Sequence, residues 1–206
     1  MAIVITVAQQ KGGTGKTTLA ANLAAALAPS RKVVLLDIDP QRSLTRWHQL
    51  RPDKAAPLTF SNVSGWRLTA ELDRLKRAHD VVLIDSPPQI DTDARLAIRA
   101  ADLVLIPVQP SPPDIWAAEG TLNLAAAEKR RSAVVLNRLP ASGKLRETMV
   151  ASLRESRHPL LTATIGNRTG FASAFAAGLG VTEATPRSIA ANELRAMLAE
   201  LLELME

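Results

Sequence analysis

Apolar residues fall in short runs along this chain, and each run has the length of a buried strand. Seven runs are expected to be strands: residues 2–8, 33–37, 58–63, 81–85, 103–108, 133–137 and 160–165. Segments with helical spacing, such as the Ala- and Leu-rich residues 17–28, separate most of them. Several runs are almost free of polar residues, which indicates burial on both faces. The pattern predicts an α/β fold with a mostly parallel sheet of about seven strands, covered by helices on both faces.

A glycine-rich segment lies between the first predicted strand and the first predicted helix, where a parallel sheet binds ligands. We expect it to hold the phosphates of a nucleotide through Gly12, Gly13, Thr14, Gly15, Lys16, Thr17 and Thr18. Lys16 would reach the β and γ phosphates, and the Thr17 hydroxyl would ligate Mg²⁺. Gln10 stands where the strict phosphate-loop pattern has Gly, and the alternative is a glycine-rich turn without a ligand. Lys11 has no evident role within its own subunit.

Carboxylates end two of the predicted strands. Asp37 and Asp39 close the second strand, and Asp85 closes the fourth. Acids at these ends would face the phosphate loop, and oxygen ligands or water-positioning groups are what Mg²⁺-assisted phosphoryl transfer requires. A single Asp at a strand end is more often a cap of the following loop or helix. The phosphate loop nearby favours a role at the nucleotide instead.

The composition narrows the possible classes of protein. The chain has 206 residues, of which 47% are hydrophobic and 22% charged, and this suits one globular domain spanning 1–206. It has no Cys, which excludes disulfides, thiolate metal sites and iron–sulfur ligation within one chain. We find no secretion signal and no apolar run long enough to span a membrane, so we expect a cytoplasmic protein without membrane contact.

Three motifs together resemble the ParA/MinD family of deviant Walker ATPases, and specifically its ParA branch. They are the lysine- and glycine-rich segment from Lys11 to Thr18, the Asp-Ile-Asp-Pro-Gln that begins at Asp37, and the Asp-Ser-Pro-Pro that begins at Asp85. The likeness covers nearly the whole chain and implies an ATPase that uses ATP and Mg²⁺. It matches Asp85 to the Walker B acid and implicates Asp39 in hydrolysis. Family members also commonly carry Gln where Gln10 stands.

The resemblance gives Lys11 a role. In this family the extra lysine reaches the phosphates of the partner's ATP, in a homodimer that forms with ATP and falls apart after hydrolysis. A cation supplied in trans stabilises charge only when two subunits meet. The alternative is that Lys11 is a solvated loop lysine.

Adenine recognition is expected at the end of the sixth strand. Asn137 and Arg138 resemble the Asn-Arg that several relatives use at the base, and an amide can pair with the adenine edge through a donor and an acceptor. Pro110, in a proline-rich loop, could line the other side. A strand-terminal Asn is also a common turn residue.

Basic residues are concentrated in one stretch of the chain. The net charge is +5, and residues 129–182 contain nine basic and two acidic residues. Such an excess suits contact with phosphate backbones, although a solvated surface is the ordinary explanation. The ParA resemblance favours nonspecific binding of double-stranded DNA and association with the nucleoid. The candidate contacts are Arg168 first, and then Arg146, Arg154 and Arg187.

Other members of the superfamily fit less well. Residues 183–206 contain five Glu and two Arg, whereas a MinD-like membrane helix would be basic. The apolar spacing of Leu194, Met197 and Leu201 predicts that this helix packs against the domain. The main alternative function is a P-loop ATP-dependent ligase or amide synthase of the cobyrinate or dethiobiotin type, but we find no insertion to bind its substrate. A nonhydrolysing nucleotide-binding scaffold is a third possibility.

The favoured hypothesis is a partitioning or positioning ATPase. Its slow hydrolysis would be stimulated by a partner, either a ParB-like protein or another adaptor. Plasmids, chromosomes, chemoreceptor clusters and carboxysomes are all moved by ParA-like proteins, and the sequence does not specify the cargo.

Overall fold

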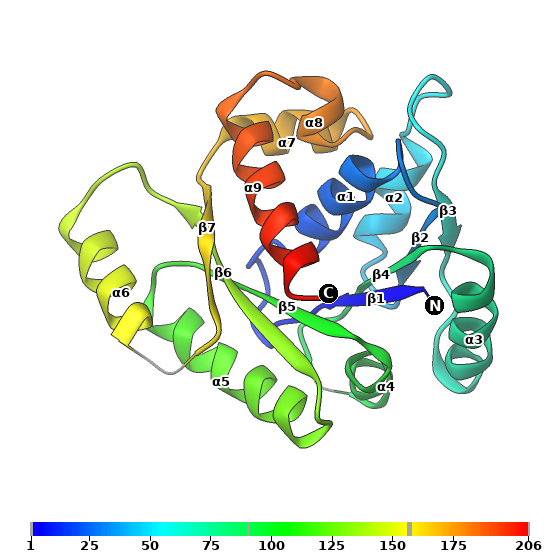
Figure 1. Ribbon diagram of the computed structural model, residues 1–206, viewed down its shortest axis with the longest axis horizontal. Helices are drawn as coiled ribbons and strands as arrows, with labels where there is room; N and C mark the ends of the chain where they lie inside the picture. The colour runs from blue at the N-terminus through cyan, green and yellow to red at the C-terminus, as the bar shows by residue number, and fades with distance from the viewer. Residues whose placement is uncertain (1, 90, 156–157, 206) are drawn as a thin grey trace.

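All seven strands join one parallel sheet in this computed structural model, which describes residues 2–89, 91–155 and 158–205 (Figure 1). The strand order is β3-β2-β4-β1-β5-β6-β7. The strands are β1 (Ile3–Val7), β2 (Val33–Asp37), β3 (Thr59–Ser61), β4 (Val81–Asp85), β5 (Leu103–Val108), β6 (Arg131–Leu139) and β7 (Leu160–Gly166). Each pair of neighbouring strands is parallel. The predicted fold class is therefore confirmed.

Helices cover both faces of the sheet. They are α1 (Lys16–Leu27), α2 (Ser43–Gln49), the 3₁₀ turn η1 (Gly65–Arg67), α3 (Leu68–Ala78), α4 (Thr92–Ala100), α5 (Pro112–Ala127), α6 (Lys144–Glu155), α7 (Thr169–Ala176), α8 (Val181–Ala184) and α9 (Ile189–Glu203). One face packs against α1, α2, α7, α8 and α9, and the other against α3, α4 and α5 (Figure 1). Side chains of β1 alternate between the two faces of the sheet: Ile5 and Val7 lie in the core on the α1 face, and Val4 lies in the core on the α3 face. Because both faces are buried, nearly every residue of this strand is apolar.

The predicted strand limits differ from the observed limits mainly at the edges. The third strand is shorter than predicted, Thr59–Ser61, and the sixth is longer, Arg131–Leu139. The carboxyl-terminal helix packs as predicted, because Leu194, Met197 and Leu201 are fully buried. Within the described residues, no helix is both long and apolar enough to cross a membrane.

Candidate nucleotide-binding site

The carboxyl ends of the central strands bring the predicted acids together. Asp37 and Asp85 are aligned across β2 and β4, and Val7, the last residue of β1, is aligned with Asp85 on its other side. The phosphate loop follows β1 directly, so it lies beside both carboxylates. The parallel sheet is the reason that residues far apart in the sequence meet at this edge.

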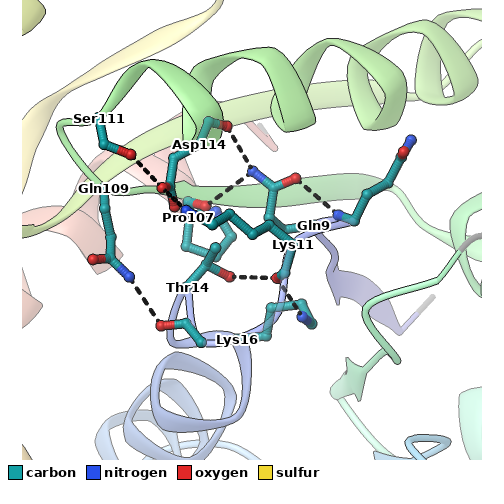
Figure 2. Close-up of polar contacts among 10 residues, drawn as sticks. Gln9, Lys11, Thr14, Lys16, Pro107, Gln109, Ser111 and Asp114 are labelled. Atoms are coloured by element: carbon teal, nitrogen blue, oxygen red, sulfur yellow. Dashed lines mark hydrogen bonds and ion pairs between the residues drawn. The ribbon is translucent and has the colours of Figure 1, made fainter.

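The loop between β1 and α1 has a conformation that needs glycine. Gly13 and Gly15 have φ of 78° and 96°, in the left-handed region. A side chain at Gly15 would also collide with the Asn137 amide. Two amides hold the loop by its carbonyls. Gln109 Nε2 donates to Gly13 O at 2.9 Å (Figure 2), and Asn137 Nδ2 donates to Thr14 O at 2.7 Å. The helix α1 then begins at Lys16, with its amino end at the loop.

Lys16 is buried beside the acids. Its side chain ends near the loop, where Nζ donates to Lys11 O at 3.3 Å (Figure 2). Burial lowers the pKa of Lys16, while the nearby charges of Asp85 and Asp39 oppose that shift. The ammonium is thus a partly desolvated cation at the floor of the site, as a phosphate-binding lysine requires.

Asp85 is a fully buried acid at the carboxyl end of β4. Neither oxygen makes a hydrogen bond of standard geometry within the described residues, although the Thr17 hydroxyl lies near enough to favour the charged form. Burial raises the pKa of Asp85 to about 8, and Asp37 adds repulsion, while Thr17 and Lys16 favour the charged form without outweighing burial. Buried polar atoms of this kind ordinarily have partners. A buried acid with so few partners fits a site where a nucleotide brings Mg²⁺, whose charge would favour loss of the Asp85 proton.

Replacing Asp85 with Asn should change how stability depends on pH. The folded protein keeps the Asp85 proton up to about pH 8, whereas the unfolded chain loses it near the ordinary pKa of 3.8. Between these values the folded state binds more protons, so rising pH favours unfolding, by up to about 1.4 kcal/mol per pH unit. Thermal unfolding from about pH 5 to about pH 8 should therefore show a smaller loss of stability for Asp85→Asn than for the wild type. Parallel curves would contradict the raised pKa.

The two acids at the carboxyl end of β2 have different surroundings. Asp37 Oδ2 accepts from Thr45 N at 2.9 Å and Thr45 Oγ1 at 2.6 Å, and Oδ1 accepts from Asp39 N at 3.1 Å. It therefore shapes the loop and the start of α2. The Asp39 carboxylate accepts from Gln41 N at 2.9 Å, and Asp39 lies in the wall of a cavity at the phosphate loop.

Two adjoining cavities have the arrangement that a nucleotide needs. The first, about 360 Å³, is lined by the phosphate loop together with Asp39 and Gln41. The second, about 260 Å³, lies between the ends of β6 and β7 and is lined by Asn137 and Phe171. Gly15, Thr18 and Arg138 line both. Phosphates fit the first cavity and a base fits the second.

The predicted base contacts are only partly in place. Asn137 lines the second cavity, but its amide is already bonded to backbone: Nδ2 to Thr14 O, and Oδ1 from Arg138 N at 3.0 Å. Its observed role is to anchor the phosphate loop. Pro110 is not among the residues that line either cavity.

A protein-only metal site is not seen in the part of the chain that the structure describes, since no three His, Cys, Asp or Glu side chains come together suitably. Mg²⁺ commonly takes few protein ligands and shares its coordination with nucleotide phosphates and water. The Thr17 hydroxyl and the Asp85 carboxyl group, which lie close together, fit this requirement.

Lys11 has a partner that the sequence did not predict. Its Nζ forms an ion pair with Asp114 Oδ2, and the Ser111 hydroxyl donates to the same oxygen (Figure 2). Asp114 lies 103 residues further along the chain, in the first turn of α5. In the sequence, Asp114 is simply an Asp that follows two prolines. It lies beside the phosphate loop because β1 and β5 are neighbours in the sheet.

The basic stretch does not form one surface. Lys129, Arg130 and Arg131 lie at the amino end of β6, away from the nucleotide site, whereas Arg138 lies near the carboxyl end of β6, at the site itself. The positive charge of this stretch is therefore divided between the two ends of the strands. Arg157, counted in that stretch, lies outside the described residues.

The DNA-binding candidates also separate. Arg168 lines the second cavity and is paired with Glu193, with Nη2 at 2.6 Å from Oε1. Arg146 and Arg154 lie on α6, and Arg187 is exposed before α9. No ion pair of Arg154 or Arg187 is seen among the described side chains.

Comparison with known proteins agrees with this site. Residues 5–181 match the family described as the CobQ/CobB/MinD/ParA nucleotide binding domain. The chain is 31% identical to maintenance of carboxysome distribution protein A of Halothiobacillus neapolitanus, covering 98% of this chain and 97% of the relative. Its fold is similar to that of apo McdA of Cyanothece, with a TM-score of 0.83 and 20% identity over 98% and 100% of the two chains. It is also similar to MinD of Pyrococcus horikoshii complexed with Mg-ADP, with a TM-score of 0.79 and 20% identity over 99% and 97%.

The fold and the loop define a P-loop-type nucleotide-binding protein. The chain belongs to the ParA/MinD family, and it is an ATPase that uses ATP and Mg²⁺. The resemblance inferred from the three motifs is confirmed.

Proposed function

We propose that this protein is a positioning ATPase whose ATP-bound homodimer binds DNA and whose slow hydrolysis, stimulated by an adaptor, moves a cargo. The single observation that supports this most is the combination of a complete phosphate site with the additional cation Lys11, which its own subunit holds away by pairing it with Asp114. A monomeric ATPase has no need of that second lysine. The maintenance of carboxysome distribution protein A of Halothiobacillus neapolitanus is similar to this chain over nearly the full length of both, which supports a positioning role.

The residues of the site have distinct roles in this proposal. Gly12, Gly13, Thr14, Gly15 and Thr18 would surround the phosphates, and Lys16 would neutralise their charge from within the subunit. Thr17 and Asp85 would hold Mg²⁺, which when bound neutralises phosphate charge during transfer. Asp37 is predicted to contribute to the same metal through its loop.

Hydrolysis would depend on two further groups. Asp39, in the wall of the phosphate cavity, would orient the attacking water. Lys11 of each subunit would reach the phosphates bound by the other subunit, so charge stabilisation is complete only in the dimer. An adaptor would stimulate turnover by ordering these groups.

For the base, Asn137 and Arg138 would border the adenine in the second cavity, with Pro110 as a more distant candidate. The amide of Asn137 is engaged by backbone, so we expect its main contribution to be support of the loop.

DNA binding would be nonspecific and would place the protein on the nucleoid. The proposed contacts are Arg168, Arg146, Arg154 and Arg187. Arg168 lies at the second cavity, and its pairing with Glu193 offers one way for a bound nucleotide to influence the availability of this cation.

The test is a DNA-retention assay with ATP or ADP over a series of salt concentrations. We expect ATP to increase retention on random-sequence DNA, and Arg168→Glu to weaken it several-fold while lowering the salt slope by about 1 per lost phosphate contact. Arg99→Glu is the matched control, because Arg99 is also an exposed arginine paired with a glutamate, on α4. Equal retention of wild type and Arg168→Glu at every salt concentration would remove Arg168 from the proposed surface.

The alternative function, an ATP-dependent amide synthase, is kept because the matched family description includes CobQ and CobB. It predicts robust turnover with a small carboxylic acid and an amide donor, and no response to DNA. The positioning ATPase predicts weak hydrolysis that DNA and an adaptor increase. One turnover assay with both kinds of addition separates them.

A further inference from the structure

Asp114 is the most deeply buried acid outside the nucleotide cavities that forms an ion pair in the described structure. Its side chain is 2% exposed, whereas that of its partner Lys11 is 41% exposed. Oδ2 accepts from Lys11 and from the Ser111 hydroxyl, and Oδ1 has no partner among the described residues. A buried carboxylate with only one cation beside it depends strongly on that cation.

The position of this carboxylate is fixed by its surroundings. Asp114 lies in the first turn of α5, where the positive end of the helix dipole favours an acid, and Pro112 and Pro113 set the start of that helix. Gln9 Nε2 donates to Asp114 O and to Pro107 O, each at 3.4 Å, and so joins the segment after β1 to this turn (Figure 2). Lys11, on the exposed loop, is therefore the partner that can move.

The two possible partners of Lys11 compete. In the free subunit the ammonium pairs with Asp114, and in the proposed dimer it pairs with the phosphates bound by the other subunit. If Lys11 moved away, the buried negative charge of Asp114 would have no cation beside it. A strongly anionic ligand is therefore needed to displace Lys11 from Asp114. A triphosphate has more negative charge than a diphosphate, which makes the exchange sensitive to the nucleotide.

We infer that Asp114 is a positioning residue: it retains Lys11 in the free subunit and thereby sets the ATP concentration at which subunits pair. This rests on the proposed ATP-dependent dimer. Asp114, a residue outside the phosphate loop, would thus regulate dimer formation. Neutralising Asp114 is therefore expected to promote dimer formation. The loss of a buried contact with a purely structural role would not have this effect.

The first experiment tests the contact without any dimer. The nucleotide-free protein is labelled with a trace of acetic anhydride, and the rates at individual lysines are measured by peptide mass spectrometry. Asp114→Asn keeps the shape of the side chain and removes its charge, so Lys11 should be labelled at least about threefold faster than in the wild type. The exposed Lys32 is the internal reference and should not change. An unchanged Lys11 rate would overturn the inference.

The second experiment measures dimer formation by light scattering during an ATP titration. For Asp114→Asn the half-maximal ATP concentration should fall about tenfold, the size of a typical charged hydrogen bond. Asp91→Asn is the matched control, because Asp91 caps the neighbouring helix α4 through Ala94 N at 2.8 Å, and its ATP requirement should stay that of the wild type.

The two possible failures differ. A wild type that dimerises normally, with an unchanged or higher ATP requirement in Asp114→Asn, would overturn this inference alone. A wild type that stays monomeric with ATP would overturn the proposed function together with it.

Discussion

Lys11→Ala is expected to abolish ATP-dependent dimerisation while nucleotide binding persists. Lys16 and the loop glycines, which line the phosphate cavity, remain in the variant, so ATP still has its own subunit's contacts. The cation that would reach the partner's phosphates is lost, and hydrolysis should fall about a thousandfold, within the range known for cations supplied in trans. Light scattering with saturating ATP should therefore show a particle of 22.1 kDa for the variant and a doubled mass for the wild type.

The control must exclude simple unfolding, because Lys11→Ala leaves Asp114 without its cation. The double variant Lys11→Ala with Asp114→Asn removes that unpaired charge and should remain monomeric as well. Lys32→Ala, an exposed lysine at the opposite edge of the sheet, should dimerise as the wild type does. A Lys11→Ala protein that dimerises with normal ATP dependence would eliminate the trans role of this lysine.

Asp39→Asn should have the opposite effect on the dimer, which we expect to form and then persist. The asparagine can still accept the Gln41 N–H, so the loop should keep its shape. It loses the negative charge that would orient and activate water, a change that commonly costs between about 10² and 10⁴ in rate. Phosphate release should fall by at least about a hundredfold while the doubled mass is retained.

Asp53→Asn is the control for this variant, because Asp53 is exposed in the loop after α2. The Asp53→Asn protein should hydrolyse ATP at the wild-type rate. If Asp39→Asn released phosphate within twofold of the wild type, Asp39 would have no part in positioning water. If hydrolysis stopped but the dimer still fell apart as quickly as before, dissociation would not depend on hydrolysis.

Local signals in the sequence were sufficient for the fold. Each strand coincides with an apolar run in the sequence. Val4, Ile5 and Val7 are all apolar because successive side chains of β1 are buried on opposite faces of the sheet. The phosphate loop was equally visible, because its glycines and Lys16 are consecutive. The acids were predictable as a group since a parallel sheet gathers the ends of its strands.

Contacts between distant segments could not be predicted in the same way. The partner of Lys11 is 103 residues away, and an aspartate near a helix start gives no indication of which cation it faces. Asn137 was read as a base contact, but its amide faces Thr14 O, which depends on how closely β6 approaches the loop. The basic stretch is continuous in the sequence and divided in space, because Arg131 and Arg138 lie near opposite ends of β6.

The two amides that hold the loop carbonyls also determine the polarity of the loop. In a trans peptide the C=O and the following N–H point in opposite directions. Gln109 donates a hydrogen bond to the carbonyl of Gly13, and Asn137 donates one to the carbonyl of Thr14. The N–H groups of Thr14 and Gly15 therefore point away from these two amides. Uncharged side chains of β6 and of the segment after β5 thus help to orient the peptide groups of the phosphate loop. ATP affinity is consequently a property that substitutions at Gln109 can alter even though this residue is not part of either cavity's lining.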